Sequence, residues 1–127
     1  MRSFALLSLL ACVWLASAGS ASAQEAAVLR GLDKVTGAAK DFIAPVDKPV
    51  AFGSLQITAR ACRQRPPEET PETSVYLEIW DAKRRTAEDG AKNAGSMVFR
   101  GWMFASSPAL NALEHPTYDV WVISCKS

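Results

Sequence analysis

Hydrophobic and polar residues alternate along four segments of this chain, all of them after residue 53. The segments are "SLQITARAC" (54–62), "SVYLEIWDA" (74–82), "SMVFRGWMF" (96–104) and "TYDVWVISC" (117–125). A period of two, carried by β-branched and aromatic residues, is typical of β-strands. The last segment is apolar on both faces except at Asp119 and Ser124, which favours a central position in a sheet.

The same alternation predicts which way individual side chains point. In segment 54–62, Cys62 falls on the face opposite the apolar residues, and in segment 117–125, Cys125 falls opposite Val122. In segment 96–104, Met97 and Phe99 share one face.

Earlier segments predict shorter strands, and one segment predicts a helix. Residues 27–37 suggest a strand that ends in a turn, and residues 38–53 suggest two extended pieces around a proline turn. Ser107 is a good helix N-cap and Pro108 fits the first helical position, whereas Pro116 would end the helix. The predicted fold is therefore mainly β, a small antiparallel sandwich or barrel of about six or seven strands with one short helix near 107–114.

The first 23 residues have the pattern of an export signal. Arg2 precedes the apolar run "FALLSLLACVWLA" (4–16), and small residues end at Ala23. We expect cleavage after Ala23, a mature single β-rich domain of residues 24–127, and a periplasmic location. The run is too short to span a membrane, and no later stretch approaches that length. A lipid anchor at Cys12 is the rival interpretation, but the apolar run continues past Cys12.

Charge and cysteine content restrict the possible partners. Arg2 leaves with the leader, so 13 of the 14 Lys and Arg residues remain against 13 Asp and Glu. A neutral chain has no basic field to hold nucleic acid. Cys62 and Cys125 are the cysteines left, and an oxidising compartment predicts a disulfide between them.

Candidate catalytic residues are few. His115 with Asp119 or a glutamate could serve a small hydrolase or lyase of envelope polymers, but no nucleophile elbow is present. His115 would follow the predicted helix, whose dipole favours a protonated imidazole, and this makes a poorer general base. One histidine and two paired cysteines predict no zinc site, and we expect no metal and no cofactor.

Candidate binding residues lie in a proline-rich stretch and among the aromatics. "RPPEETPE" follows Cys62 closely, and a stiff segment tied down by a disulfide loses little entropy on binding. Trp80 lies on the more polar face of its segment and is the best aromatic candidate for an exposed platform. For Trp80, Trp102 and Trp121 as a set, core packing is the expected role and a ligand platform is the alternative. The predicted partner contacts are Arg63, Arg65, Pro66, Pro67, Glu68, Glu69 and Trp80.

Three stretches carry a resemblance to a known family. "LDKVTG", "FGSLQITARACRQRPPEETPE" and "GWMFASSPALNALEHPTYDVWVISCK" together resemble a family of small exported proteobacterial proteins that form a domain of unknown function. The resemblance covers about residues 28 to 126 and implies export in a Gram-negative cell. It implies no activity, substrate or site residue. We therefore expect a non-catalytic binding or structural module whose partner is an envelope protein or a cell-wall component.

Overall fold

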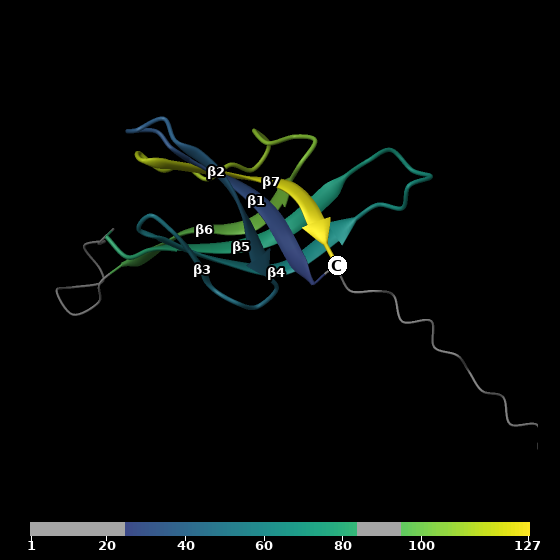
Figure 1. The fold of residues 1–127 in the computed structure, drawn as a ribbon, viewed down its shortest axis with the longest axis horizontal. Helices are drawn as coiled ribbons and strands as arrows, with labels where there is room; N and C mark the ends of the chain where they lie inside the picture. Colours follow the sequence, from purple (N-terminus) through teal and green to yellow (C-terminus); the bar gives the residue numbers. More distant parts are fainter. Residues whose placement is uncertain (1–24, 84–94) are drawn as a thin grey trace, which may run out of the picture.

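Two antiparallel sheets stack face to face in the computed structural model, which describes residues 25–83 and 95–127 (Figure 1). One sheet has the order β2-β1-β7 and the other the order β3-β4-β5-β6. The strands are β1 (Ala26–Asp33), β2 (Ala39–Pro45), β3 (Val50–Phe52), β4 (Leu55–Gln64), β5 (Thr73–Asp81), β6 (Ser96–Phe104) and β7 (Tyr118–Lys126). The predicted β-sandwich is confirmed, and the four alternating segments correspond to β4, β5, β6 and β7. The predicted leader and Cys12 lie outside the described residues, as does most of the polar segment 84–94.

Aliphatic side chains from both sheets form the core between the layers. Its largest fully buried members are Leu29, Leu55, Ile57, Val75, Leu77 and Ile79. Three small residues, Ala27, Ala44 and Ala59, are also completely buried and let the layers approach closely. Trp80, Trp102 and Trp121 are not in this core cluster, so core packing is the wrong role for the tryptophans.

The predicted helix near 107–114 is not formed, and no helix is present in residues 25–83 and 95–127. Ser107 and Pro108 instead open a single turn, closed by a hydrogen bond from Leu110 N to Ser107 O at 3.0 Å. Beyond the turn, Leu113 and His115 are buried while Glu114 between them is exposed. An extended chain buries both side chains, whereas an isolated helix of about eight residues is too short to offset the free-energy cost of its nucleation.

β7 lies at an edge of the three-stranded sheet, so the central position expected for it is wrong. Its inner residues Val120 and Val122 are buried in the core. The apolar residues on its outer face are not covered by a neighbouring strand or layer, because Trp121 is only half-buried and Ile123 is exposed. The two-faced apolar character of β7 therefore comes from exposed hydrophobic side chains.

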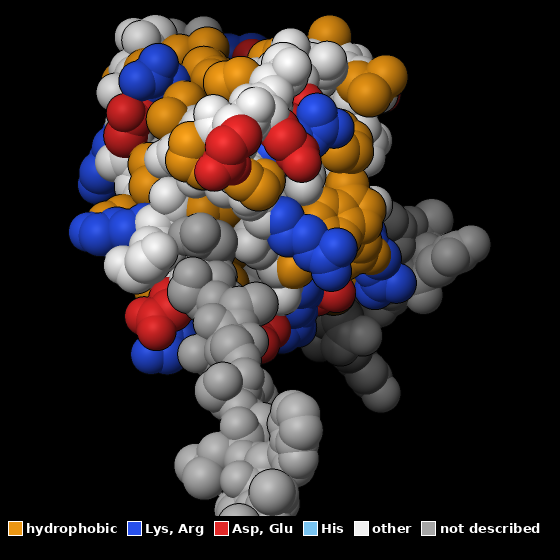
Figure 2. Space-filling view, turned by 90° about the vertical axis from the view of Figure 1, so that its right-hand side faces the viewer, with side chains coloured by type: hydrophobic (Ala, Val, Ile, Leu, Met, Phe, Trp, Pro, Cys, Tyr) orange, Lys and Arg blue, Asp and Glu red, His pale blue; other side chains and the backbone are white. Residues whose placement is uncertain are grey.

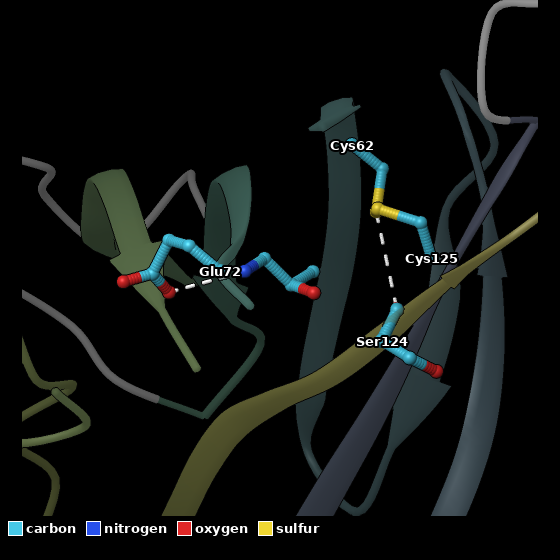
Figure 3. The surroundings of a disulfide bond; sticks show 5 residues. Cys62, Glu72, Ser124 and Cys125 are labelled. Carbon is cyan, nitrogen blue, oxygen red and sulfur yellow. Dashed lines mark hydrogen bonds between the residues drawn. A yellow bond between two sulfur atoms is a disulfide. The ribbon is translucent and has the colours of Figure 1, made fainter. Parts of the chain in front are cut away.

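Two β-bulges reverse the predicted direction of both cysteines. In β4 the register shifts between Ala59 and Ala61, which leaves Arg60 without a partner position. In β7 the pairing with β1 skips Ile123. Each extra residue inverts the alternation beyond it, so Cys62 and Cys125 both face the other sheet and form a disulfide across the sandwich (Figure 3).

A third bulge changes the predicted faces of β6. The pairing of β5 with β6 shifts between Ile79 and Trp80 and skips Val98. Phe99 pairs with the buried Ile79 and packs against the core, whereas Met97 pairs with Trp80 and is exposed. Met97 and Phe99 therefore lie on opposite faces, not on the same face.

Candidate functional site

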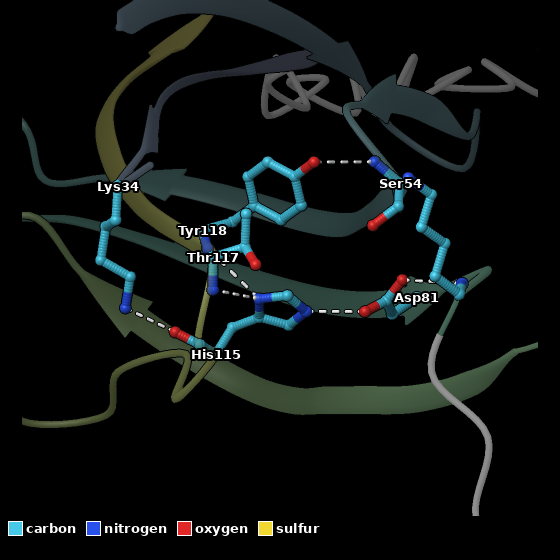
Figure 4. A network of polar contacts seen from close by, with 7 residues as sticks. Lys34, Ser54, Asp81, His115, Thr117 and Tyr118 are labelled. Atoms are coloured by element: carbon cyan, nitrogen blue, oxygen red, sulfur yellow. Dashed lines mark hydrogen bonds and ion pairs between the residues drawn. The ribbon is translucent and has the colours of Figure 1, made fainter. Parts of the chain in front are cut away.

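His115 is buried at the centre of a polar network that joins three parts of the chain (Figure 4). Its Nε2 lies 2.6 Å from Oδ2 of Asp81, at the end of β5. Its Nδ1 accepts hydrogen bonds from the backbone N–H groups of Thr117 at 3.0 Å and Tyr118 at 3.2 Å. Two donors at Nδ1 require an unprotonated nitrogen there, so the ring is the neutral tautomer with its hydrogen on Nε2.

Asp81 is held as a carboxylate in this buried position. Desolvation acts to raise its pKa, but hydrogen bonds from His115, the Lys83 backbone N–H and Ser54 outweigh it, and the pKa lies below its ordinary value. The His115 Nε2–H group donates to that carboxylate, which is a strong charge-assisted hydrogen bond. The pair ties the segment before β7 to the end of β5.

A hollow of about 420 Å³ lies beside this network and is lined by Ser54, Asp81, Lys83, His115, Pro116, Thr117 and Tyr118. A general base needs a free lone pair aimed at the substrate. Neither nitrogen of His115 offers one, because Nε2 donates to Asp81 and Nδ1 accepts from two N–H groups. In this arrangement the contacts of His115 hold the chain in position.

Asp119, the predicted catalytic partner of His115, contacts a different residue. Its carboxylate lies 3.5 Å from Nζ of Lys34, and both side chains are more than a third exposed. Lys34 also donates to the backbone oxygen of His115 at 2.5 Å. Lys34 thus links the neighbourhoods of His115 and Asp119, but the structure brings Asp81, which sequence reasoning did not single out, to the imidazole.

A second cluster of interacting side chains, made of arginines and aromatic residues, lies on the outer face of the four-stranded sheet. The guanidinium of Arg63 in β4 stacks over the ring of Trp102 in β6, 5.5 Å from its centroid. Tyr76 in β5 meets the same ring edge to face, with centroids 5.5 Å apart. We call Arg63, Arg65, Tyr76, Trp102 and Phe104 the arginine–aromatic patch. The bulge at Arg60 that turns Cys62 inward also turns Arg63 outward onto this patch.

The patch borders an open hollow of about 370 Å³ that is lined by Arg63, Gln64, Arg65, Pro66, Glu72, Ser74 and Phe104. Figure 2 views the molecule from the end at which the loop 64–72 projects, and it shows Lys and Arg side chains lying directly against hydrophobic ones. A neighbouring hollow of about 190 Å³ lies against the loop itself and includes Pro66, Pro67 and Glu69 in its lining. Guanidinium groups beside aromatic rings and open hollows suit recognition of an anionic partner.

Loop 64–72 is anchored at its base by Glu72. The Glu72 carboxylate accepts hydrogen bonds from the hydroxyl and the backbone N–H of Ser106, and from the backbone N–H of Thr73. The hydrogen bonds from Ser106 are the main cause that lowers the pKa of Glu72, with a smaller contribution from Arg65. Arg65 N also donates to Glu72 O at 3.0 Å. The loop is therefore held by the turn that follows β6 and by the start of β5.

The predicted contact residues divide into two groups. Arg63, Arg65 and Pro66 line one hollow together, and Pro67 and Glu69 join Arg65 and Pro66 in the adjacent hollow, with Glu68 exposed on the same loop. Trp80 lies at the opposite end of β5, where it lines a hollow of about 190 Å³ with Gln56, Thr58, Glu78 and Met97. The sequence placed Tyr76 on a polar face, but only the register with β6 shows that Trp102 meets it.

Two kinds of feature are absent from the described residues. Over residues 25–83 and 95–127, no group of three or more His, Cys, Asp or Glu side chains is arranged to hold a metal ion. Over the same ranges, no helix has the length and apolar character needed to cross a bilayer.

Comparisons with known proteins give a family but no activity. No solved structure matches the chain. An uncharacterized protein of Rickettsia prowazekii (strain Madrid E) is 24% identical over 94 residues, which cover 74% of this chain and 56% of that protein. The chain thus spans little more than half the length of this curated relative. A family model matches residues 27–125, which include all seven strands almost completely. This chain therefore belongs to the family DUF2155, described as an uncharacterized protein conserved in bacteria.

Proposed function

We propose that this protein is an exported, non-catalytic binding module of the bacterial cell envelope, and that it contacts its partner through the arginine–aromatic patch and loop 64–72. Export is supported by the leader-like residues 1–23. It is also supported by the bridge between Cys62 and Cys125, because such bonds persist in oxidising compartments. The partner is an envelope protein or a cell-wall component.

The observation that carries the binding role is the stacking of Arg63 on Trp102 beside an open hollow. An exposed guanidinium normally samples many rotamers, and ordering it costs free energy on binding. Here the ring of Trp102 already orients Arg63, and Glu72 already fixes the loop that carries Arg65. A surface ordered before binding loses less entropy when the partner docks.

A hydrolase or lyase acting through His115 and Asp119 is the alternative function. The hydrogen bonds of His115 do not support it, because both ring nitrogens are already engaged away from Asp119. No other contact of the described residues favours an enzyme, so we propose the binding module as the function.

Two measurements test the proposed function. Cell fractionation with intact-mass analysis should find a periplasmic chain that begins at Gln24 and has no free thiols. Purified protein should then co-sediment with isolated envelopes, and Arg63→Glu with Arg65→Glu should reduce that co-sedimentation. The matched control is Lys40→Glu with Lys48→Glu, two exposed cations on other parts of the surface. Equal co-sedimentation of all three proteins, or none by the wild type, would refute the binding role of the patch.

A further inference from the structure

We infer that the partner of the arginine–aromatic patch is a protein with an acidic surface, not a glycan, a lipid or a second copy of this chain. This inference rests on the proposed function and specifies the partner class. It depends on three properties of the outer face of β4, β5 and β6, which are its composition, its unbalanced charge and its fixed side chains.

The composition of this face is that of a protein–protein interface. Strands β4, β5 and β6 contain no lysine, and their outward positions carry Tyr76, Trp80, Trp102, Phe104, Met97 and several arginines. Aromatic residues, methionine and arginine are enriched where proteins bind proteins, and lysine is depleted there. Tyr, Trp and Arg are also the residues that most often dominate the binding free energy.

The strands of this face carry more arginine than carboxylate, although the mature chain is expected to be neutral. Arg60 is compensated by ion pairs with Asp47 at 3.1 Å and Glu78 at 3.2 Å. Arg63 and Arg100 are exposed and have no ion pair with any residue of the described ranges. Arg65, on the adjoining loop, acts on Glu72 and helps to lower the pKa of that carboxyl. A partner that brings carboxylates to Arg63 and Arg100 would be steered to this face and bind it specifically.

The same charge argues against self-association through this face. A two-fold interface places the same surface patch of each copy against the other. Two copies docked through the strands of this face would bring Arg63 and Arg100 toward the same arginines, while Glu78 is already bound to Arg60. The exposed Glu68 and Glu69 lie on the adjoining loop, not on these strands. Like charges brought together at an interface cost several kcal/mol, which favours an acidic surface supplied by a different protein.

The hollow beside Trp102 could receive side chains of a partner, because Arg63 and Arg65 line it. Trp102 holds Arg63 on one side and Tyr76 at its edge. The adjoining hollow offers Phe104 and Pro66 as apolar walls and Arg63 and Arg65 as charged walls. An acidic side chain flanked by an apolar one would match these walls.

Site-specific photo-crosslinking in the living cell tests the inference. The full-length chain carries a photoreactive phenylalanine analogue in place of Tyr76, and a second strain carries it in place of Val35, which is 78% exposed in the turn after β1. Position 76 should give a protease-sensitive adduct, position 35 should not, and mass spectrometry should place the bond beside Asp or Glu on the partner. Arg63→Glu with Arg65→Glu should reduce the adduct about tenfold or more, and a compensating Glu→Arg change in the partner should restore it.

The possible failures are distinguishable. A protease-resistant adduct with the mass of a glycan or lipid, or an adduct of two copies of this chain, would overturn the acidic-protein inference and leave the binding module intact. A protein adduct that survives the two charge reversals unchanged would also overturn it. No adduct from position 76, together with no co-sedimentation with envelopes, would remove the proposed function itself. Thiol titration of each variant shows whether the disulfide, and with it the fold, has formed.

Discussion

Cys62 and Cys125 are bonded across the two sheets, and each faces its partner only because a β-bulge lies close before it in the chain. Strict alternation would point both sulfur atoms away from the core. Arg60 and Ile123 are the extra residues that invert the alternation in β4 and β7. The bridge joins residues 63 apart, which corresponds to about 4 kcal/mol of stability on the chain-entropy model.

Deleting Ile123 should therefore preserve the disulfide. The shortened β7 runs from Val122 directly to Ser124, so Ser124 still pairs with Val28 and Cys125 with Ala27, and Cys125 keeps facing the other sheet. Thiol titration of the oxidised, unfolded protein should find no free thiols after the deletion or after Ile123→Ala, whereas an alanine inserted between Ser124 and Cys125 should turn Cys125 outward and leave two free thiols per chain. Two free thiols after the deletion would contradict the assignment of Ile123 as the extra residue of β7.

Acid should destabilise the protein partly through Asp81. The pKa of this carboxyl is lower in the folded state than its ordinary value of 3.8. A lowered folded-state pKa gives stability that is present above the unfolded pKa and is lost as the pH falls through the folded one. Urea unfolding from pH 6 to pH 2 should show this loss below about pH 4, and it should be smaller in Asp81→Asn. An identical acid dependence in Asp81→Asn would contradict the role given to this carboxylate.

His115→Ala should be costly at neutral pH because it leaves the Asp81 carboxylate buried without its main donor. We expect a loss of about 2 to 4 kcal/mol in the free energy of unfolding.

A nitrogen–proton correlation spectrum of the wild type should show the hydrogen of the His115 ring on Nε2. A spectrum with protonated Nδ1 at neutral pH would contradict the two backbone hydrogen bonds to that atom.

Glu72→Gln should loosen loop 64–72 with little effect on the rest of the fold. An amide keeps only part of the acceptor capacity that now binds the hydroxyl and N–H of Ser106. Hydrogen exchange should rise in residues 64–72, and protease cleavage should move to this loop, while the core strands remain protected. The exposed Glu69→Gln is the matched control, and a similar rise in exchange in both variants would show that Glu72 is not the anchor.

Gly53→Ala should destabilise the protein more than Gly37→Ala. Both glycines have positive φ, 57° and 75°, so an alanine is strained at either position. A Cβ at Gly53 would lie 2.3 Å from the hydroxyl oxygen of Tyr118, whereas a Cβ at Gly37 meets nothing within 4 Å. Thermal unfolding should show a loss of about 1 kcal/mol for Gly37→Ala and about 2 to 4 kcal/mol for Gly53→Ala. Equal losses would mean that Tyr118 can move aside.

The local pattern alone was enough to predict the strands. Period-two alternation over 54–62, 74–82, 96–104 and 117–125 located β4, β5, β6 and β7, and the turn residues located β1, β2 and β3. The cysteine pair was also predictable, because setting aside the predicted leader leaves two cysteines, which have one partner each. Strand formation and cysteine pairing depend on residues close in sequence or on simple counting, which is why they can be read without coordinates.

The candidate site could be predicted only in part. "RPPEETPE" and its neighbours Arg63 and Arg65 were recognisable as a stiff basic segment, but Tyr76 and Trp102 join them only through the register of β5 with β6. Asp81 is 34 residues before His115 and meets it through the packing of β5 against the segment before β7. Such pairings depend on long-range contacts that no local pattern encodes.

By itself, therefore, the sequence determined the strands, the mainly β antiparallel class and the identity of the bridged cysteines. The tertiary structure decided the choice of a sandwich, the direction of individual side chains, the edge position of β7, the turn and extended chain in place of a helix at 107–114, and the partner of His115. The physical reason is that one bulge residue reverses every side chain beyond it, and bulges form where strands must match across a sheet. The bulge at Arg60 sends Cys62 into the core and Arg63 onto Trp102, so the disulfide and the binding surface depend on the same local irregularity.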